Sequence, residues 1–291
     1  MLDVLFPFSY IGVCLGFLVG VGLTAATIGF LSAGLIIILI YIGVIRIMPI
    51  LRLCKRGFMI FPYYETAVKN IRDSFKIRGT IPSDPSIFMW HPHGVFCTSS
   101  FFHTATSITE WSAEVKVAAL SSLRWLPFSE EIFEEFKAIP NTYFHMKDAL
   151  ANHSLSVAPG GMREMLYKDT AILARRRGIF KMALETGTQL VPIVSVNEDR
   201  LCEIIDIPYI QEFLEPYDIC ICIPNFKSLW KLLSLLVHPL KDPIVSVVGT
   251  PLVVERVEIP SEAQISELRA KYILALKSLY KAEVGRELTI I

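Results

Sequence analysis

The sequence has 291 residues, of which 53% are hydrophobic, and its 28 basic residues balance its 28 acidic residues. A net charge near zero argues against a nucleic-acid-binding surface, and the length suits one large domain, with or without a membrane element. The six cysteines are scattered and form no Cys-x-x-Cys pair. This pattern is typical of reduced, mostly buried thiols in a cytosol-facing protein.

Residues 4–45 contain no Asp, Glu, Lys or Arg. A membrane-spanning helix needs about 20 apolar residues, so this stretch can hold two. Basic residues at positions 46, 52, 55 and 56 place its exit on the cytosolic side. We therefore expect a transmembrane or re-entrant hairpin over residues 1–48 and a cytosol-facing domain over residues 49–291. One long tilted span and a buried pair of core helices are the alternatives.

Beyond residue 48, short apolar runs alternate with amphipathic helical patterns. Strands are predicted over residues 86–90, 115–120, 155–158, 189–196, 244–248 and 252–257. Helices are predicted over residues 128–137, 179–186 and 261–282, with Gly187 as a C-cap and a capping box formed by Ser261 and Gln264. Near-continuous apolar strands between helices predict an α/β fold with a mainly parallel central sheet flanked by helices.

A further apolar stretch covers residues 229–240 and is too short to span a bilayer. A helix lying in the membrane interface and a buried core helix explain it equally well.

The first predicted strand ends in His91-Pro92-His93-Gly94, called the histidine motif below. Histidine exchanges a proton readily near neutral pH, and a stiff turn at a strand end is suited to placing a general base. His-x-His can also supply two zinc ligands. No other histidine has a spacing that would supply the third ligand, so we expect no metal. A pair of structural histidines in a turn is the remaining alternative.

A second motif, Pro159-Gly160-Gly161, follows the predicted strand 155–158. Consecutive glycines at a strand end expose backbone N–H groups that can bind an oxyanion or a phosphate. Glu164 follows one turn later and could orient an imidazolium ion. The alternative is an ordinary strand-to-helix turn with a solvated Arg-Glu pair.

A third motif, the arginine triplet, consists of Arg175, Arg176 and Arg177, with Lys181 one turn further on. Three adjacent guanidinium groups before a helix suit a phosphate-binding patch. A solvated face or a lipid headgroup contact would show the same charge. The sequence has neither a Gly-x-Ser-x-Gly elbow nor a phosphate-binding nucleotide loop, which argues against a hydrolase triad and nucleotide chemistry.

In this order, the three motifs and the segment 178–193 resemble the type-2 diacylglycerol acyltransferase family, which includes monoacylglycerol and wax-alcohol acyltransferases. The resemblance extends from about residue 10 to residue 282 and includes residues 248–254 and the last predicted helix. Two segments depart from the family pattern. Ile60-Phe61-Pro62 lacks the family's tyrosine, and Val196-Asn197-Glu198-Asp199 keeps the glutamate but lacks the glycine.

The resemblance implies a glycerolipid-acyltransferase-like fold and transfer of a fatty acyl group from acyl-CoA to a neutral lipid alcohol. His93 would be the general base, supported by His91 and partnered by Glu164, since plant relatives replace the first histidine by glutamate. Gly94, Gly160 and Gly161 would offer N–H groups to the oxyanion. The CoA phosphates would be bound by Arg175, Arg176, Arg177 and Lys181.

The acceptor that the resemblance favours is diacylglycerol, which would give triacylglycerol. Monoacylglycerol, a long-chain wax alcohol, and a catalytically silent lipid-binding membrane protein are the alternatives. Acyl-CoA is then a co-substrate, and no cofactor is expected. The expected partners are the lipid acceptor and the bilayer, without nucleic acid, and homo-oligomerisation is left open. The expected location is the endoplasmic reticulum membrane, with lipid droplets as a second site.

Overall fold

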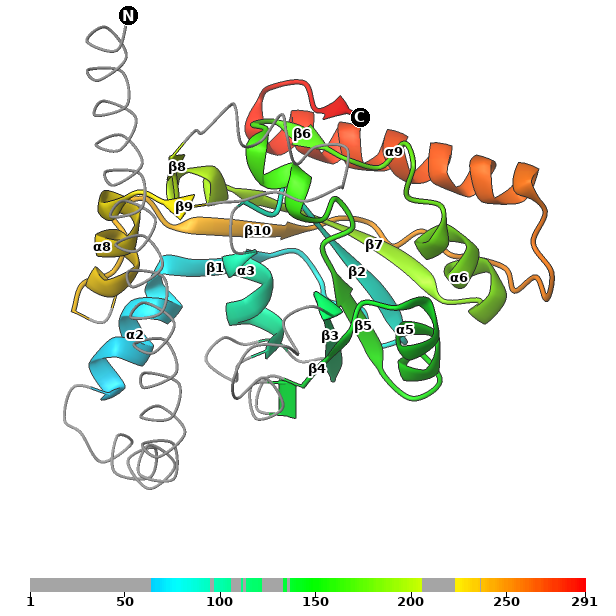
Figure 1. Cartoon of the computed structure of the whole chain (residues 1–291), viewed down its shortest axis with the longest axis horizontal. Coiled ribbons are helices and arrows are strands. Elements are labelled where there is room, and N and C mark those ends of the chain that lie inside the picture. Colours follow the sequence, from blue (N-terminus) through cyan, green and yellow to red (C-terminus); the bar gives the residue numbers. More distant parts are fainter. Residues whose placement is uncertain are drawn as a thin grey trace, which may run out of the picture. The chain divides into compact units, whose positions relative to one another are not determined.

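A seven-stranded sheet forms the centre of the domain (Figure 1). The structure is a computed structural model that describes residues 64–94, 97–105, 111, 114–121, 133–134, 137–205, 223–235 and 237–291. These residues belong to one unit of the chain, Phe61–Ile291. The predicted hairpin over residues 1–48 lies outside the described residues, as does most of the predicted helix 128–137.

The sheet is mainly parallel, as the sequence predicts. Its strands are β1 (Phe75–Arg78), β2 (Ser86–His91), β3 (Val115–Ala119), β4 (Ala138–Pro140), β5 (Ser154–Val157), β7 (Gln189–Val196) and β10 (Ile244–Val248). Their spatial order is β1-β10-β7-β2-β5-β3-β4, and β10 with β7 is the one antiparallel pairing in it. The apolar runs along the chain are therefore the strands of a mainly parallel sheet, and the helices between them cover its faces.

Two short pairings complete the strands that the structure describes. β6 (Thr170–Ala171) pairs in parallel with β11 (Thr289–Ile290), and β8 (Ile204–Ile205) pairs antiparallel with β9 (Ile223–Pro224). The β11 segment is also joined to the residues after β6, since the Ile291 carbonyl accepts from the N–H groups of Leu173 and Ala174. These bonds tie residues 169–174 to the region near residue 290.

The helical elements are α2 (Tyr64–Ser74), α3 (Thr98–Ser100), a π-helical turn η1 (Phe101–Ala105), α5 (Tyr143–Ala149), α6 (Gly178–Thr186), α8 (Phe226–Ser234) and α9 (Glu262–Val284). Two 3₁₀ turns, η3 (Met162–Leu166) and η4 (Glu198–Arg200), follow strands β5 and β7. The predicted caps are confirmed. Gly187 ends α6 with φ 69°, and Ser261 and Gln264 form the capping box of α9.

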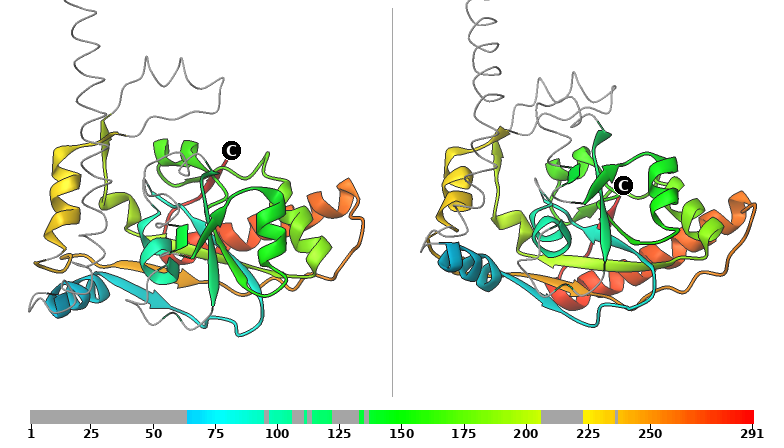
Figure 2. Two further views of the ribbon diagram at one scale, coloured as in Figure 1. Left: turned by 60° about the horizontal axis from the view of Figure 1, so that its bottom comes forward. Right: turned by 90° about the horizontal axis from the view of Figure 1, so that it is seen from below.

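The core is divided between the two faces of the sheet. In β2, Ile87 and Met89 pack with α6 and α9, whereas Phe88 and Trp90 pack on the opposite face. This alternation follows the two-residue period of a strand. Figure 2 shows α9 lying along one face of the sheet, against β7. His91 is two residues after Met89, so its side chain falls on the same face of β2 as that of Met89. This is the face that α9 covers.

The predicted strand 252–257 is wrong. Leu252 makes a single antiparallel bridge with Leu190, and Val253 is 84% exposed. Pro251 has no N–H group to donate to a ladder, and further along, the Val257 N–H bonds to the Leu184 carbonyl of α6. The segment therefore connects sheet and helix without joining the sheet.

The apolar stretch after residue 225 forms an amphipathic surface helix, α8. Phe226 and Trp230, one turn apart, are 80% and 64% exposed, while Ser228 and Leu235 are buried. A fully buried core helix is therefore excluded. Among the described residues, none of the helices is both long and apolar enough to cross a bilayer.

Replacing Ser261 by alanine should destabilise the protein, because it removes the acceptor of the Gln264 N–H group at the start of α9. We expect a loss of about 1 kcal/mol in the free energy of unfolding. Denaturant unfolding of the purified protein measures it. Ser278→Ala, on the exposed face of the same helix, is the matched control. An equal loss in both variants would contradict the capping role.

Candidate active site

Two of the sequence motifs and a third segment meet at one edge of the sheet. Strands β7, β2 and β5 are adjacent and parallel, so their carboxyl ends lie together. The histidine motif follows β2, Pro159-Gly160-Gly161 follows β5, and residues 197–200 follow β7. This edge is where open α/β sheets bind their ligands.

His93 is buried and sits between two backbone carbonyls. Its Nδ1 lies 2.8 Å from the Gly94 oxygen, and its Nε2 lies 2.9 Å from the Gly161 oxygen. Carbonyl oxygens only accept hydrogen bonds, so a protonated ring nitrogen donates wherever one of these contacts is made. The two carbonyls together fix the orientation of the His93 ring.

Glu164 joins the histidine motif to the strand after the Pro-Gly-Gly turn. Its Oε1 accepts from the His93 backbone N–H at 3.2 Å, and its Oε2 accepts from the Ile172 N–H at 3.0 Å. Burial by itself would raise the pKa of the Glu164 carboxyl, but His91, His93 and the Ile172 N–H together hold that pKa below its ordinary value. Glu164 is thus a buried anion beside both histidines, as the sequence predicts.

Gly160 and Gly161 are required for different structural reasons. A side chain at Gly160 would overlap the Glu164 carboxyl group, with its Cβ 2.7 Å from the Glu164 Cβ. Gly161 has φ +68°, a conformation that favours glycine, and its own N–H bonds to the Ala158 oxygen at 3.3 Å. In this conformation the Gly161 N–H stabilises the turn and the Gly161 carbonyl faces His93. The predicted oxyanion role of Gly94, Gly160 and Gly161 stays a prediction.

His91 lies deeper than His93, on the α9 face of the sheet. Its Nδ1 is 3.8 Å from Glu164 Oε1, too long for a hydrogen bond, and neither ring nitrogen has a hydrogen-bond partner in the described part of the chain. The Tyr272 ring of α9 lies 6.0 Å away. Its surroundings make His91 a buried neighbour of Glu164, which fits a supporting position.

Glu198 is a second buried carboxyl at the same edge, which the sequence analysis noted but did not assign to the site. Its oxygens accept from the Ser99 backbone N–H, at 3.1 and 3.3 Å, and from the Ser99 hydroxyl. A Cβ on Gly94 would lie 2.8 Å from the Glu198 Cγ. Burial raises the pKa of the Glu198 carboxyl, although Ser99, Thr98 and His93 act in the opposite direction. The signal was available, because Glu198 directly follows a strand that neighbours β2.

Cys97 is the cysteine closest to the histidine motif. Burial and the nearby charge of Glu198 raise the pKa of its thiol. A thiol in such surroundings is held protonated and is a poor nucleophile. The site therefore does not present Cys97 as an acyl carrier.

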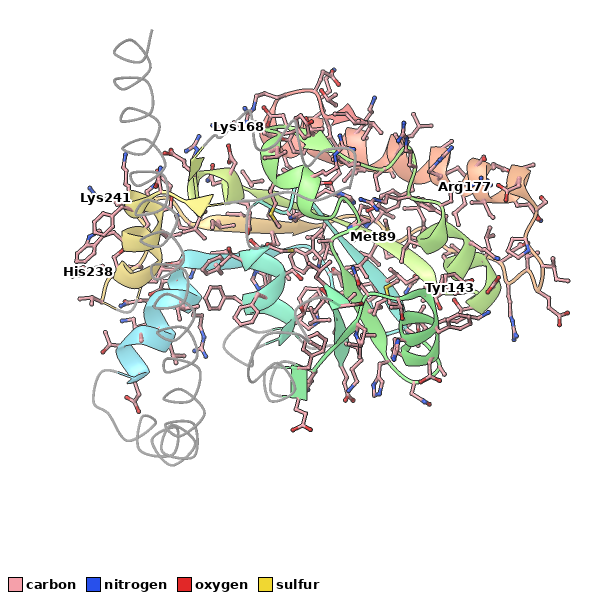
Figure 3. The ribbon with its side chains drawn as sticks, in the orientation of Figure 1. Met89, Tyr143, Lys168, Arg177, His238 and Lys241 are labelled. Atoms are coloured by element: carbon pink, nitrogen blue, oxygen red, sulfur yellow. The ribbon has the colours of Figure 1, made fainter. Side chains whose placement is uncertain are left out.

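The arginine triplet lines a cavity of about 290 Å³ together with Val157 and Pro159 at the end of β5. The Arg176 Nη2 donates to the Gly160 oxygen at 3.0 Å, and Arg177, labelled in Figure 3, pairs with Glu262 at the start of α9. Arg175 is exposed. The three arginines are thus brought beside the Pro-Gly-Gly turn, as a phosphate-binding role requires.

Lys181 is directed away from this cavity. It lies 3.6 Å from the Glu185 carboxylate and 5.8 Å from the centre of the Tyr143 ring. The predicted contact of Lys181 with CoA stays a prediction. The position of Lys181 in this conformation does not support it. In the described ranges, no group of three or more His, Cys, Asp or Glu side chains is arranged to hold a metal ion.

A larger cavity, of about 600 Å³, borders the histidine motif. Pro92 and Gly94, which flank His93, line it together with Ser195, Val196 and Asn197 at the end of β7. A buried histidine, two carboxyl groups and two cavities at one sheet edge are an arrangement that suits proton-assisted transfer between two substrates.

Comparison with known proteins shows that this protein belongs to the class of acyltransferases. The model of the family described as diacylglycerol acyltransferase matches residues 79–287. Diacylglycerol O-acyltransferase 2 of Xenopus tropicalis is 28% identical over 246 residues, covering 75% of this chain and 68% of that protein. Acyl-CoA wax alcohol acyltransferase 2 of Homo sapiens is 27% identical over 230 residues, covering 70% and 67%.

Diacylglycerol O-acyltransferase 2-like protein 6 of Bos taurus is 28% identical over 273 residues, covering 81% of this chain and 78% of that protein. Among solved structures, a 1-acyl-sn-glycerophosphate acyltransferase from Thermotoga maritima superposes with a TM-score of 0.47 at 14% identity, covering 80% of this chain and 90% of that one. The chain belongs to the diacylglycerol acyltransferase family, and it is an acyltransferase enzyme.

Gly160→Ala should displace Glu164, because the added methyl group would occupy the space of its carboxyl group. Overpacking of this kind costs about 1–3 kcal/mol, so thermal unfolding should begin at a lower temperature. Gly178→Ala is the matched control, since a Cβ there meets nothing within 4 Å. Equal unfolding temperatures for the two variants would show that Glu164 can move freely.

Glu198→Gln should stabilise the protein more at pH 8 than at pH 5. With its pKa raised above the ordinary 4.5, the folded carboxyl still binds a proton at pH values where the unfolded carboxyl has lost it. The contribution of Glu198 to the free energy of unfolding therefore falls as the pH rises from the unfolded pKa through the folded pKa. Gln removes this loss and still offers an oxygen to Ser99. Unfolding temperatures at the two pH values measure the effect, with Glu258→Gln on an exposed loop as the control. A pH-independent difference from the wild type would contradict it.

Proposed function

We propose that the protein transfers a fatty acyl group from acyl-CoA to the hydroxyl group of a neutral lipid, with diacylglycerol as the acceptor and triacylglycerol as the product. The observation that carries this proposal is the position of His93, whose backbone N–H bonds to Glu164 and whose neighbours Pro92 and Gly94 line the larger cavity. The names of the relatives, which include diacylglycerol and wax alcohol acyltransferases, support the reaction class.

His93 is the proposed general base. In the resting arrangement its Nε2 faces the Gly161 carbonyl, so the acceptor hydroxyl has to replace that contact and meet a nitrogen lone pair. The hydroxyl oxygen then attacks the thioester carbon while its proton passes to His93. Collapse of the tetrahedral intermediate breaks the C–S bond, and the proton leaves with the CoA thiol.

Glu164 has two proposed tasks. It fixes the backbone of His93 through its N–H group, and its negative charge stabilises the imidazolium ion that forms during transfer. The raised pKa of Cys97 supports direct transfer without an acyl-enzyme. Each proton in this scheme therefore passes through His93.

The arginine triplet is the proposed binding site for the CoA phosphates. Guanidinium groups pair with phosphate oxygens in a forked geometry, and this cavity has three of them at the end of β5. The acyl thioester would then enter from the Pro-Gly-Gly side of His93. Monoacylglycerol and long-chain alcohols remain the alternative acceptors. For the long-chain alcohol, a relative named for wax alcohols is 27% identical to this chain, against 28% for one named for diacylglycerol.

A membrane location fits this chemistry, because the acceptor is dissolved in a bilayer. We propose the endoplasmic reticulum membrane, with the catalytic domain in the cytosol and the uncharged residues 4–45 as the anchor. The exposed Phe226 and Trp230 of α8 are suited to the interface of the same membrane.

His93→Gln should lower acyl transfer by about 100-fold or more, because the general base is lost. The test uses the purified full chain in vesicles with labelled oleoyl-CoA and, in parallel, diacylglycerol, monoacylglycerol and hexadecanol. His91→Gln should retain more activity, since His91 occupies a supporting position. A wild-type rate for His93→Gln removes the assignment of the base, and transfer to none of the acceptors refutes the proposed function.

Arg175→Ala should raise the apparent KM for acyl-CoA by about tenfold and change kcat little, because it removes a ground-state phosphate contact. Arg175 is the cleanest probe of the triplet, since Arg176 and Arg177 have protein partners. Arg256→Ala, an exposed arginine outside both cavities, is the control. An unchanged KM for Arg175→Ala would favour a lipid headgroup contact.

A further inference from the structure

The larger cavity has a lining that the sequence motifs did not anticipate. Beside Pro92 and Gly94 at the histidine motif, it is lined by the segment that follows Glu164, by the turn after β7 and by the last turn of α9. Its volume of about 600 Å³ lies in the range of small-molecule binding sites.

The two cavities take their sheet residues from different neighbours of strand β2. In the sheet order β7-β2-β5, the larger cavity is lined from the end of β7 and the arginine cavity from the end of β5. No residue lines both. Figure 3 shows Lys168 of the larger cavity to the upper left of Met89 and Arg177 of the smaller cavity to its upper right. Two substrates could therefore approach the histidine motif without sharing a binding surface.

The charges of the two cavities differ. The lining of the arginine cavity contains three arginines and no carboxylate. The larger cavity sets Lys168, Arg200 and Arg286 against four carboxylates, those of Asp169, Asp199, Glu203 and Glu283.

Part of this charge is already paired within the protein. Arg286 lies 2.6 Å from Asp169, and Glu283 pairs with Arg78. A phosphate group in the larger cavity would meet carboxylates without a surplus of cations, which costs binding energy.

Resting on the proposed function, we infer that the larger cavity binds the head region of an uncharged, oxygen-rich acceptor, a glyceride with hydroxyl and ester oxygens. Lys168 and Asp199 offer a donor and an acceptor to such oxygens, and Met165, Leu166 and Val284 offer apolar surface to the adjoining chains. A long-chain alcohol has a single hydroxyl group and would use little of this polar lining. The cavity therefore selects a glyceride over a wax alcohol and over a phosphorylated lipid.

The first test is photo-crosslinking, which needs no turnover. The full chain in phosphatidylcholine vesicles is irradiated with a diacylglycerol that carries a diazirine next to the glycerol backbone, and labelled peptides are identified by mass spectrometry. We expect labels within residues 165–169 or 195–203, reduced at least about fivefold by unlabelled diacylglycerol but not by CoA. Labelling elsewhere, including residues 175–179, would overturn the inference. Labelling of the cavity by a protein that transfers no acyl group would refute only the proposed function.

The second test reverses the charge of the cavity. Asp199→Lys combined with Glu203→Lys should raise the rate with lysophosphatidic acid relative to diacylglycerol by about tenfold, since two carboxylates become cations. Glu255→Lys combined with Glu258→Lys, outside the cavity, should leave this ratio unchanged. The KM for acyl-CoA should stay constant in both. An unchanged ratio in the cavity variant, with folding verified by its unfolding temperature, would contradict a headgroup site.

Discussion

The buried carboxylate of Glu164 is the contact on which the site depends. One oxygen accepts the backbone N–H of His93 and the other accepts that of Ile172, so this single side chain connects the histidine motif to the segment that leads into the arginine triplet. A buried anion is costly unless it is hydrogen-bonded and near positive charge. Here the two N–H groups supply the hydrogen bonds, and His91 and His93 help to hold the pKa of the Glu164 carboxyl below its ordinary value. Gly160 follows from the same requirement, because any side chain there would take the place of the carboxyl group.

Much of the fold could be read from the sequence because its signals are local. The apolar runs of β2 and β7, the Gly187 cap and the capping box of α9 depend on residues close together in the chain. The family resemblance implied that Glu164 lies beside His93, and the structure shows why, since β2 and β5 are adjacent parallel strands that end at a common edge. The predicted strand 252–257 failed because apolar composition alone does not report whether a ladder partner is available.

The finer parts of the site could not be predicted, since they depend on long-range contacts. Nothing local indicates that both nitrogens of His93 face carbonyls, that Lys181 turns toward Glu185, or that Glu198 reaches Ser99 from 99 positions away. The same holds for the two cavities. Their linings come from the ends of different strands, β7 and β5, and the difference in their charges comes from segments that no single motif contains.

The pairing of β6 with β11 has a consequence for how the enzyme is made. Residues 169–174 lie between Glu164 and the arginine triplet, and their strand partner is residues 289–291, more than a hundred positions later. During synthesis the ribosome releases the histidine motif, Glu164 and the arginines well before that partner exists. Contacts of such separation form late, after the loop-closure cost has been met. The segment between Glu164 and the arginine triplet is therefore fully hydrogen-bonded only after residues 289–291 have joined it.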